Sequence, residues 1–298
     1  MSAAARAVAA PRYEPALMRR KLSGTLFYGA CLAAVGITML AIVLLLFDIL
    51  SRGVSHLDLD FLLGRPSSRP ERAGVLPALV GSLELGVMVA VLAFPVGVGA
   101  AVYLEEYARA SRLNQLLRTN IANLAGVPSI VYGIFGLALF VRGIGLGYTL
   151  LAAALTMALL ILPVIIIATM EAIRSVPSSQ REAAYALGAT RWQVVRGAVL
   201  PAAAPGIMTG IILSMARAIG ETAPLILIGA VTFVTYIPSP IEGGYTVLPI
   251  QIFSWASRFQ PAFQEISATA IIVLLVLLAL LNVLAIIVRV RLSRHLQW

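Results

Sequence analysis

The chain has 298 residues, of which 60% are hydrophobic and only 12% are charged. Ordinary soluble domains carry about 25% charged residues, so this composition excludes a soluble globular protein and indicates an integral membrane protein. The formal net charge of +9 points to nucleic acid or to a membrane as partner. The arginines cluster in alternate loops between apolar runs, as described below. We therefore expect the lipid bilayer as partner and no nucleic acid.

Apolar runs without charge predict the membrane spans. A helix needs about 20 apolar residues to cross a bilayer, and these runs are too continuous for the alternating pattern of a β-barrel. We interpret the two runs that flank Arg217 and Glu221 as one span, because the sequence ARAIGETA lacks turn chemistry. The prediction is an all-α integral membrane protein with six transmembrane helices. In chain order the runs cover residues 22–47, 85–104, 119–141, 143–170, 197–216, 222–241 and 266–288.

The charged loops predict the orientation of the chain. Most arginines lie in the N-terminal segment 1–26, in loops 105–118 and 171–196, and in the C-terminal tail. Six spans place these four segments on one side, and the positive-inside rule assigns that side, with both termini, to the cytoplasm. The first outer loop is the main exception, since its four arginines are only partly offset by acidic residues. We expect a multi-pass plasma-membrane protein whose residues 27–298 form a single transmembrane domain.

The sequence argues against an enzyme. Lys21 is the only lysine and is followed by Leu22, so no phosphate-binding P-loop can be formed. Cys31 is the only cysteine, which excludes an internal disulfide or a cysteine metal cluster. His56 and His295 fall in loops on opposite sides of the membrane. We therefore expect no cofactor, no metal and no catalytic site, and any ATP hydrolysis must come from a partner.

The cytoplasmic loop 171–200 carries a polar segment, REAAYALGATRWQVVRGAVLP at 181–201, between two apolar runs. Ser179 and Glu182 have the spacing of a capping box, which predicts a short helix that stops at Gly188. Thr190 and Gln193 repeat the spacing and predict a second helix. Small side chains at Ala183, Ala184 and Ala186 let another surface approach the first helix closely. The pattern fits a docking element for a partner, and equally a well-capped connector between two spans.

A family resemblance favours docking. Glu182-Ala183-Ala184, followed by Gly188 and by Leu200-Pro201, resembles the EAA motif of the permeases of binding-protein-dependent ABC importers. In that family this loop sits in a cleft of the ATPase subunit, which implies that Glu182, Ala183, Ala184 and Gly188 couple the permease to the ATPase. The resemblance also implies the type I ABC importer permease fold. Ala198 departs from the isoleucine that the family usually has two residues before Leu200-Pro201.

Three further segments narrow the resemblance. The strings AGVPSIVYGIFGL (125–137), RAIGETAPL (217–225) and VLPIQIFSWAS (247–257) are similar to the PstA-type permeases of the phosphate-specific transport system. The likeness extends over residues 75–290. The sister PstC-type permeases share much of it but usually lack Ala223-Pro224. The resemblance implies that this chain forms half of the translocation path of an ATP-driven phosphate importer. It also implies three partners: a homodimeric ATPase, a PstC-like second permease and an extracytoplasmic phosphate-binding protein.

Arg217 and Glu221 are the candidate residues of the path, with Ser214 one turn earlier. On a continuous helix Arg217 and Glu221 share a face. A charge at the bilayer centre costs about 2.5–3.5 kcal/mol on insertion scales, so such residues face the protein interior or a watery cavity. A guanidinium offers paired donors to an oxyanion, and the family resemblance points to the same two positions. A salt bridge that fixes this span against its neighbours is the alternative.

Other functions remain open at this stage. The resemblance is compatible with a PstC-type subunit or with a permease for another oxyanion, while composition alone allows a secondary transporter or a channel. A channel has no need of the EAA loop, and no internal repeat is evident. The aromatic outer segment 234–265 fits either a lid or re-entrant segment that meets the binding protein, or an aromatic anchor at the lipid headgroups.

Overall fold

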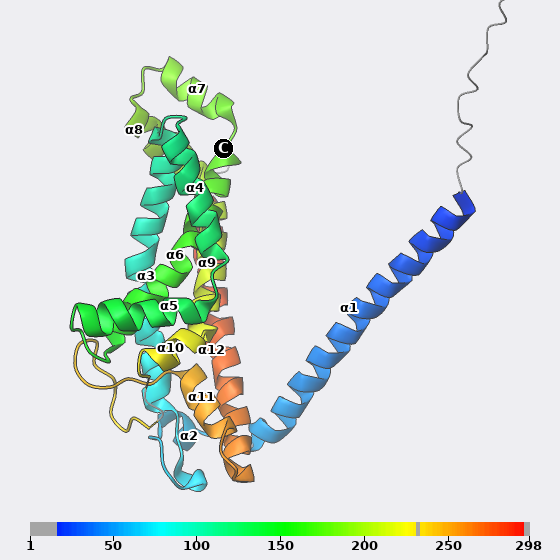
Figure 1. The fold of residues 1–298 in the computed structure, drawn as a ribbon, viewed down its shortest axis with the longest axis vertical. Coiled ribbons are helices and arrows are strands. Elements are labelled where there is room, and N and C mark those ends of the chain that lie inside the picture. Colours follow the sequence, from blue (N-terminus) through cyan, green and yellow to red (C-terminus); the bar gives the residue numbers. More distant parts are fainter. Residues whose placement is uncertain (1–16, 231–232, 295–298) are drawn as a thin grey trace, which may run out of the picture. The chain divides into compact units, whose positions relative to one another are not determined.

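The computed structural model describes residues 17–230 and 233–294, so most of the predicted N-terminal segment, His295 and both chain ends lie outside the described residues. The chain divides into two compact units, Met1–Ile49 and Leu50–Trp298. Every regular element in the described ranges is a helix (Figure 1). The predicted all-α fold is confirmed.

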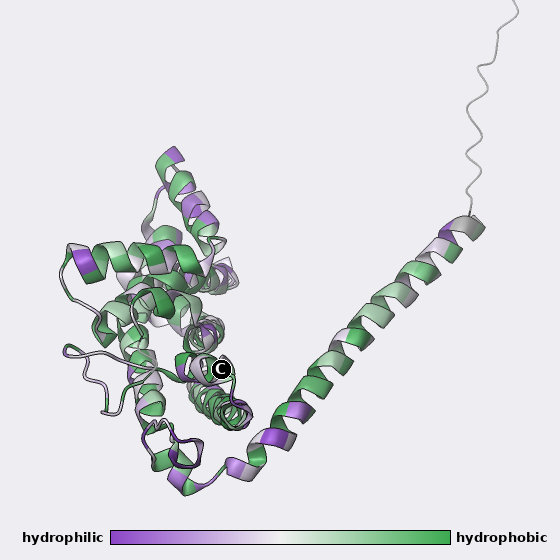
Figure 2. Cartoon of the chain, turned by 60° about the horizontal axis from the view of Figure 1, so that its bottom comes forward, coloured by the Kyte–Doolittle hydropathy of each residue, from purple (hydrophilic) through white to green (hydrophobic). Residues whose placement is uncertain are grey.

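The described part of the first unit is helix α1 (Leu17–Gly53), whose last residues belong to the second unit. At a rise of about 1.5 Å per residue, its 37 residues exceed the length needed to cross a bilayer. Figure 2 shows hydrophobic residues along most of its length. The first predicted span is therefore one uninterrupted helix.

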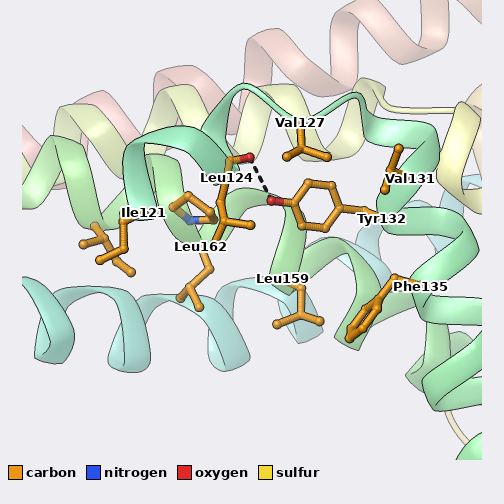
Figure 3. Close-up of a pocket in the computed structure, with 10 residues that line it drawn as sticks. Ile121, Leu124, Val127, Val131, Tyr132, Phe135, Leu159 and Leu162 are labelled. Atoms are coloured by element: carbon orange, nitrogen blue, oxygen red, sulfur yellow. Dashed lines mark hydrogen bonds between the residues drawn. The ribbon is translucent and has the colours of Figure 1, made fainter. Parts of the chain in front are cut away.

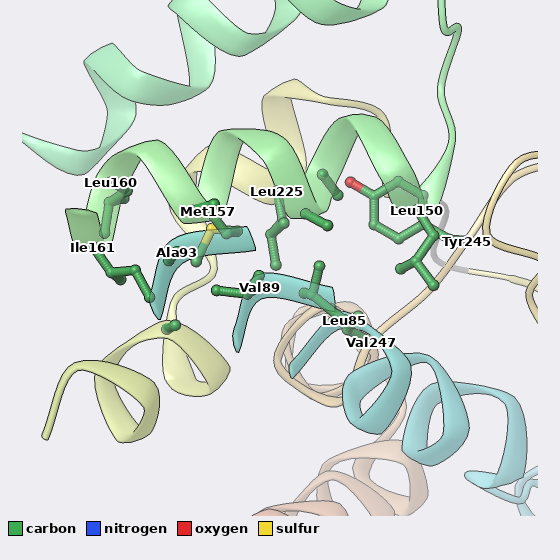
Figure 4. Packing of buried hydrophobic residues seen from close by; sticks show 14 of the residues in the cluster. Leu85, Val89, Ala93, Leu150, Met157, Leu160, Ile161, Leu225, Tyr245 and Val247 are labelled. Atoms are coloured by element: carbon green, nitrogen blue, oxygen red, sulfur yellow. The ribbon is translucent and has the colours of Figure 1, made fainter. Parts of the chain in front are cut away.

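Four long helices form the frame of the second unit: α3 (Leu76–Val102), α6 (Leu150–Arg174), α9 (Leu200–Gly220) and α12 (Pro261–Arg294). Helix α6 packs against both α3 and α9. Its buried side chains meet those of α3, with Met157 and Ile161 of α6 beside Val89 and Ala93 of α3 (Figure 4). Close approach depends on small residues, because a Cβ at Gly97 of α3 would lie 2.6 Å from Cγ2 of Ile165.

The third predicted span is broken. Helix α4 (Arg112–Ala125) and the pair α5 (Ser129–Gly136) and η4 (Leu137–Gly143) meet at a bend of 101°. The break falls at Gly126, Val127 and Pro128. Proline lacks an N–H and disfavours helical backbone in the residue before it, so the helix cannot run through. Within the described residues, five helices are long and apolar enough to cross a membrane, and the count is six when the bent pair is one span.

The fifth predicted span also differs from expectation. Helix α9 ends at Gly220, Glu221 has extended backbone (φ −80°, ψ 130°), and α10 (Ala223–Leu227) begins anew. The prediction of one continuous helix through Arg217 and Glu221 was wrong. Pro224 supplies the reason, since it fits the first turn of a new helix but not the interior of a continuing one.

Short elements close the end of the unit opposite to the loop 171–200 (Figure 1): η1 (Val54–His56), α2 (Leu59–Leu63), η2 (Pro70–Arg72) and α11 (Leu248–Ala256). Asp58 caps α2, because its carboxylate accepts the Phe61 N–H at 2.7 Å. The Phe61 ring packs against Trp255 of α11, with ring centroids 6.1 Å apart. Trp255 is buried and so is no headgroup anchor, whereas Phe259 is fully exposed.

Candidate functional site

The loop 171–200 folds as the predicted pair of helices. Helix α7 (Ser178–Ala186) and helix α8 (Arg191–Val194) are joined at Gly188, which has φ +80°. The Gly188 N–H donates to Tyr185 O at 2.9 Å and the Ala189 N–H to Ala184 O at 3.1 Å. This is the Schellman arrangement, which requires left-handed backbone at the residue after the helix. The predicted glycine bend is confirmed.

The caps are only partly as predicted. Helix α7 begins at Ser178 after Pro177 and has no side-chain cap, so the Ser179–Glu182 capping box was wrong. Pro177 occupies the cap position, so the helix begins at Ser178, two residues earlier than the box requires. The second box is present, since Gln193 Oε1 accepts the Thr190 N–H at 2.7 Å. From α8 the chain continues without interruption through η5 (Val195–Val199) into α9.

The α7–α8 pair presents an exposed surface that is partly apolar. Glu182, Ala183 and Gly188 are exposed, whereas Ala184 turns inward and packs on the buried cluster below. Next to them Leu187 is 89% exposed and Trp192 is 56% exposed. Large apolar side chains on a polar projection are typical of a protein interface. Their exposure was not foreseen from the sequence, although Leu187 stands directly before the helix-ending glycine.

The three candidate residues of the path are not brought to one surface. Ser214 is buried, and its hydroxyl donates to Gly210 O at 2.8 Å. Arg217 is exposed in the last turn of α9, and Glu221 is half-buried on the extended backbone that follows. Because α9 ends between them, Arg217 and Glu221 do not share a helix face. In the described part of the chain they form no ion pair.

A second acidic group in the spans, Glu84, was not among the residues singled out from the sequence. Glu84 lies on α3, and its Oε2 is buried without a hydrogen-bond partner among the described residues. The start of α11 packs on α3 two residues before Glu84, where the Leu248 N–H donates to Ser82 Oγ at 2.8 Å. Burial raises the pKa of the Tyr245 hydroxyl, so this group stays protonated, and it also lacks a hydrogen-bond partner among the described residues. An acid at such a position is a functional candidate by default.

An apolar pocket beside the broken third span is not an anion site. It has a volume of about 460 Å³ and lies in the corner between the bent pair α4–α5 and α6 (Figure 3). All ten of its lining side chains are apolar except Tyr132, whose hydroxyl donates to Leu124 O at 2.9 Å. Nothing in this lining can neutralise a charged ligand, so we do not expect an anionic substrate to bind there.

The chain combines membrane-spanning helices with a capped two-helix projection between two of them. This is the architecture of an importer permease. Residues 93–298 match the family described as binding-protein-dependent transport system inner membrane component. The chain belongs to this family, and it is thus a multi-pass protein of the inner membrane. The predicted family is confirmed.

Particular relatives agree with the predicted resemblance. The phosphate transport system permease protein PstA 1 of Mycobacterium tuberculosis (strain CDC 1551 / Oshkosh) is 33% identical over 283 residues, which cover 93% of this chain and 92% of the relative. A probable ABC transporter permease protein, YqgI of Bacillus subtilis (strain 168), is 37% identical over 72% of this chain and 73% of its own length.

A solved structure supports the fold alone. The crystal structure of a bacterial alginate ABC transporter, in complex with an alginate pentasaccharide-bound periplasmic protein, contains a chain that superposes with a TM-score of 0.67 at 15% identity. The match covers 93% of this chain and 98% of that one. The predicted importer permease fold is confirmed.

Proposed function

We propose that this chain is a permease subunit of an ATP-driven importer of inorganic phosphate and forms half of its translocation path. One observation carries the proposal: the identity to PstA 1 extends over 92% of that relative, so it includes both the spans and the loop 171–200. Residues 27–298 act as one permease domain. A PstC-type subunit, or a permease for another oxyanion, is the competing assignment.

Coupling to the ATPase takes place at the α7–α8 projection. Glu182, Ala183 and Gly188 are exposed there, beside Leu187 and Trp192, which suits insertion into a cleft of another protein. Ala184 supports the projection from below. Because the chain has no P-loop lysine, the nucleotide site belongs to the partner, a homodimeric ATPase.

The translocation path includes the end of α9. Arg217 is exposed in the chain on its own. In the complex, a PstC-like second permease lies against this side and completes the path around Arg217. Its guanidinium offers two parallel donors to an oxyanion. Glu221, which has extended backbone just after the end of α9, modulates that contact. Ser214 contributes from the buried side, where its hydroxyl is held by Gly210 O.

The membrane orientation follows from the arginine-rich loops. Both termini and the α7–α8 projection are cytoplasmic, and the opposite end, with α2 and α11, faces an extracytoplasmic phosphate-binding protein. The outer segment 234–265 contributes to that docking. Its one fully exposed aromatic side chain, Phe259, is available for it.

A reconstituted complex tests the substrate. The chain is produced with candidate ATPase, second-permease and binding-protein subunits from the same organism, and proteoliposomes holding ATP are supplied with labelled phosphate. We expect saturable phosphate uptake that a large excess of sulfate does not reduce. Uptake of sulfate in place of phosphate rejects the proposed substrate.

A further inference from the structure

Three consecutive residues at the end of α3 contact four other elements. They lie in η3 (Tyr103–Tyr107), a π-helical segment that continues α3. Glu105 forms ion pairs with Arg118 of α4 and, at 2.9 Å, with Arg174 at the end of α6. Short π-helical segments inside α-helices occur frequently at functional sites. This segment connects one span directly to its neighbours.

The next residue, Glu106, holds α7. Its Oε1 accepts from Arg181 Nε at 3.1 Å and from Arg181 Nη2 at 2.9 Å. The same guanidinium donates to Ile173 O at 2.9 Å and to Val176 O at 2.7 Å, which are carbonyls at and just beyond the end of α6. The Glu106 side chain is only 9% exposed and that of Arg181 22%. One guanidinium therefore joins α7, η3 and the end of α6.

Tyr107 contacts the other helix of the projection. The Arg191 guanidinium, in the first residue of α8, lies 5.4 Å from the centroid of the Tyr107 ring. Helix α8 is also anchored by its buried last residue, Val194, and by the buried Val195 that follows it in η5. Every residue of α7, in contrast, is at least partly exposed. The attachment of α7 to the spans thus depends mainly on Arg181.

We propose that Glu106 and Arg181 form a positioning pair that makes α7 and the end of α3 move as one body. Movement of a docked ATPase then reaches α3 through η3. The inference rests on the proposed function, because it assumes that an ATPase docks on α7 and α8. Lysine cannot replace Arg181, since a single ammonium cannot reach a carboxylate and two separate carbonyls with the geometry of the guanidinium fork.

A distance measurement tests the rigid connection. Spin labels are placed at Tyr103→Cys and Gln180→Cys, both exposed, in a Cys31→Ser background of the assembled complex. We expect one narrow distance that ATP does not change. Arg181→Lys, or the isosteric Glu106→Gln if the lysine variant does not assemble, should broaden it. An equally narrow distance in the variants overturns the proposal.

Transport measured against ATP hydrolysis tests the consequence. In the Arg181→Lys complex the ATPase should still copurify and hydrolyse ATP, while phosphate imported per ATP falls by about tenfold, within the usual range of coupling between sites. Arg112→Lys is the control, because Arg112 is exposed and makes no hydrogen bond or ion pair with the described residues. An unchanged ratio in Arg181→Lys contradicts the inference. A wild-type complex that imports no phosphate rejects the proposed function instead, and the distance measurement then decides the inference alone.

Discussion

At the scale of single residues, Arg217 is the side chain whose removal is most informative. We predict that Arg217→Gln abolishes phosphate uptake, because the amide keeps hydrogen-bonding capacity but removes the charge and the paired donors. The complex should still assemble, and its ATPase should still respond to the binding protein. Labelled-phosphate uptake and ATP hydrolysis by the same proteoliposomes check both expectations.

Arg142→Gln is the matched control for Arg217, because Arg142 is also exposed but lies in η4, outside the proposed path. It should leave uptake unchanged. If Arg217→Gln instead depletes the protein from the membrane while uptake per surviving complex stays normal, Arg217 has a structural role and the site assignment fails.

Local chemistry made some of these residues predictable from the sequence. The stop at Gly188 and the Thr190–Gln193 box depend on neighbours three or four positions away, and both are present. Glu221 was misplaced, because its position depends on where α9 ends. Pro224, three residues later, carried the signal for that end. The contact between Glu106 and Arg181 joins positions 75 apart, which no local pattern indicates.

At the scale of elements, the bend between α7 and α8 requires left-handed backbone at Gly188. A Cβ there meets nothing within 4 Å, so substitution is strained by its φ and not by a clash. We predict that Gly188→Glu, which costs about 1–2 kcal/mol for a left-handed residue, disrupts the projection. Copurification of the ATPase and ATP-driven uptake should both collapse, while membrane insertion stays normal.

Gly188→Asn separates the backbone requirement from other effects. Asparagine tolerates left-handed backbone far better than glutamate does, so this variant should retain most of the uptake. Normal uptake in Gly188→Glu contradicts docking through the α7–α8 projection.

The packing of α3 against α6 gives a second test at this scale. Gly97 faces Ile165, whereas a Cβ at Gly99, two residues later on α3, meets nothing within 4 Å. We predict that Gly97→Leu destabilises the isolated chain by about 1–3 kcal/mol or more, as overpacking does, and that Gly99→Leu does not. Thermal unfolding of both variants in detergent measures the difference. Equal stability of the two would show that α3 and α6 do not pack as described.

Composition predicted six spans, a number that the described helices reach when the bent pair counts as one span, but it did not predict where the spans break. The apolar run over 119–141 is continuous in hydropathy, so its bend at Gly126–Pro128 is invisible to a count of charges. Backbone chemistry carries the missing signal, because Pro128 stops the preceding helix. Apolar runs indicate which segments lie in the lipid bilayer. Glycine and proline indicate where the chain bends within the bilayer.

At the scale of the whole molecule, orientation is the first property to test. Single cysteines at Ala110, Tyr185 and Glu242 are all exposed in the structure, so differences in labelling report the side of the membrane. In a Cys31→Ser background and in intact cells, we predict that positions 110 and 185 resist an impermeant thiol reagent. Position 242 should react. The opposite pattern would place α7 and α8 outside the cell, where no ATPase is available.

ATP-driven import separates a permease of this family from a channel or a secondary transporter. The most direct measurement is labelled-phosphate uptake by proteoliposomes that contain the complete complex, with ATP, with a non-hydrolysable analogue, or with a phosphate gradient alone. We predict uptake against the gradient only with ATP and the binding protein, and its loss in Gly188→Glu. Equal uptake without hydrolysis, driven by the gradient, would contradict an ATP-coupled importer permease.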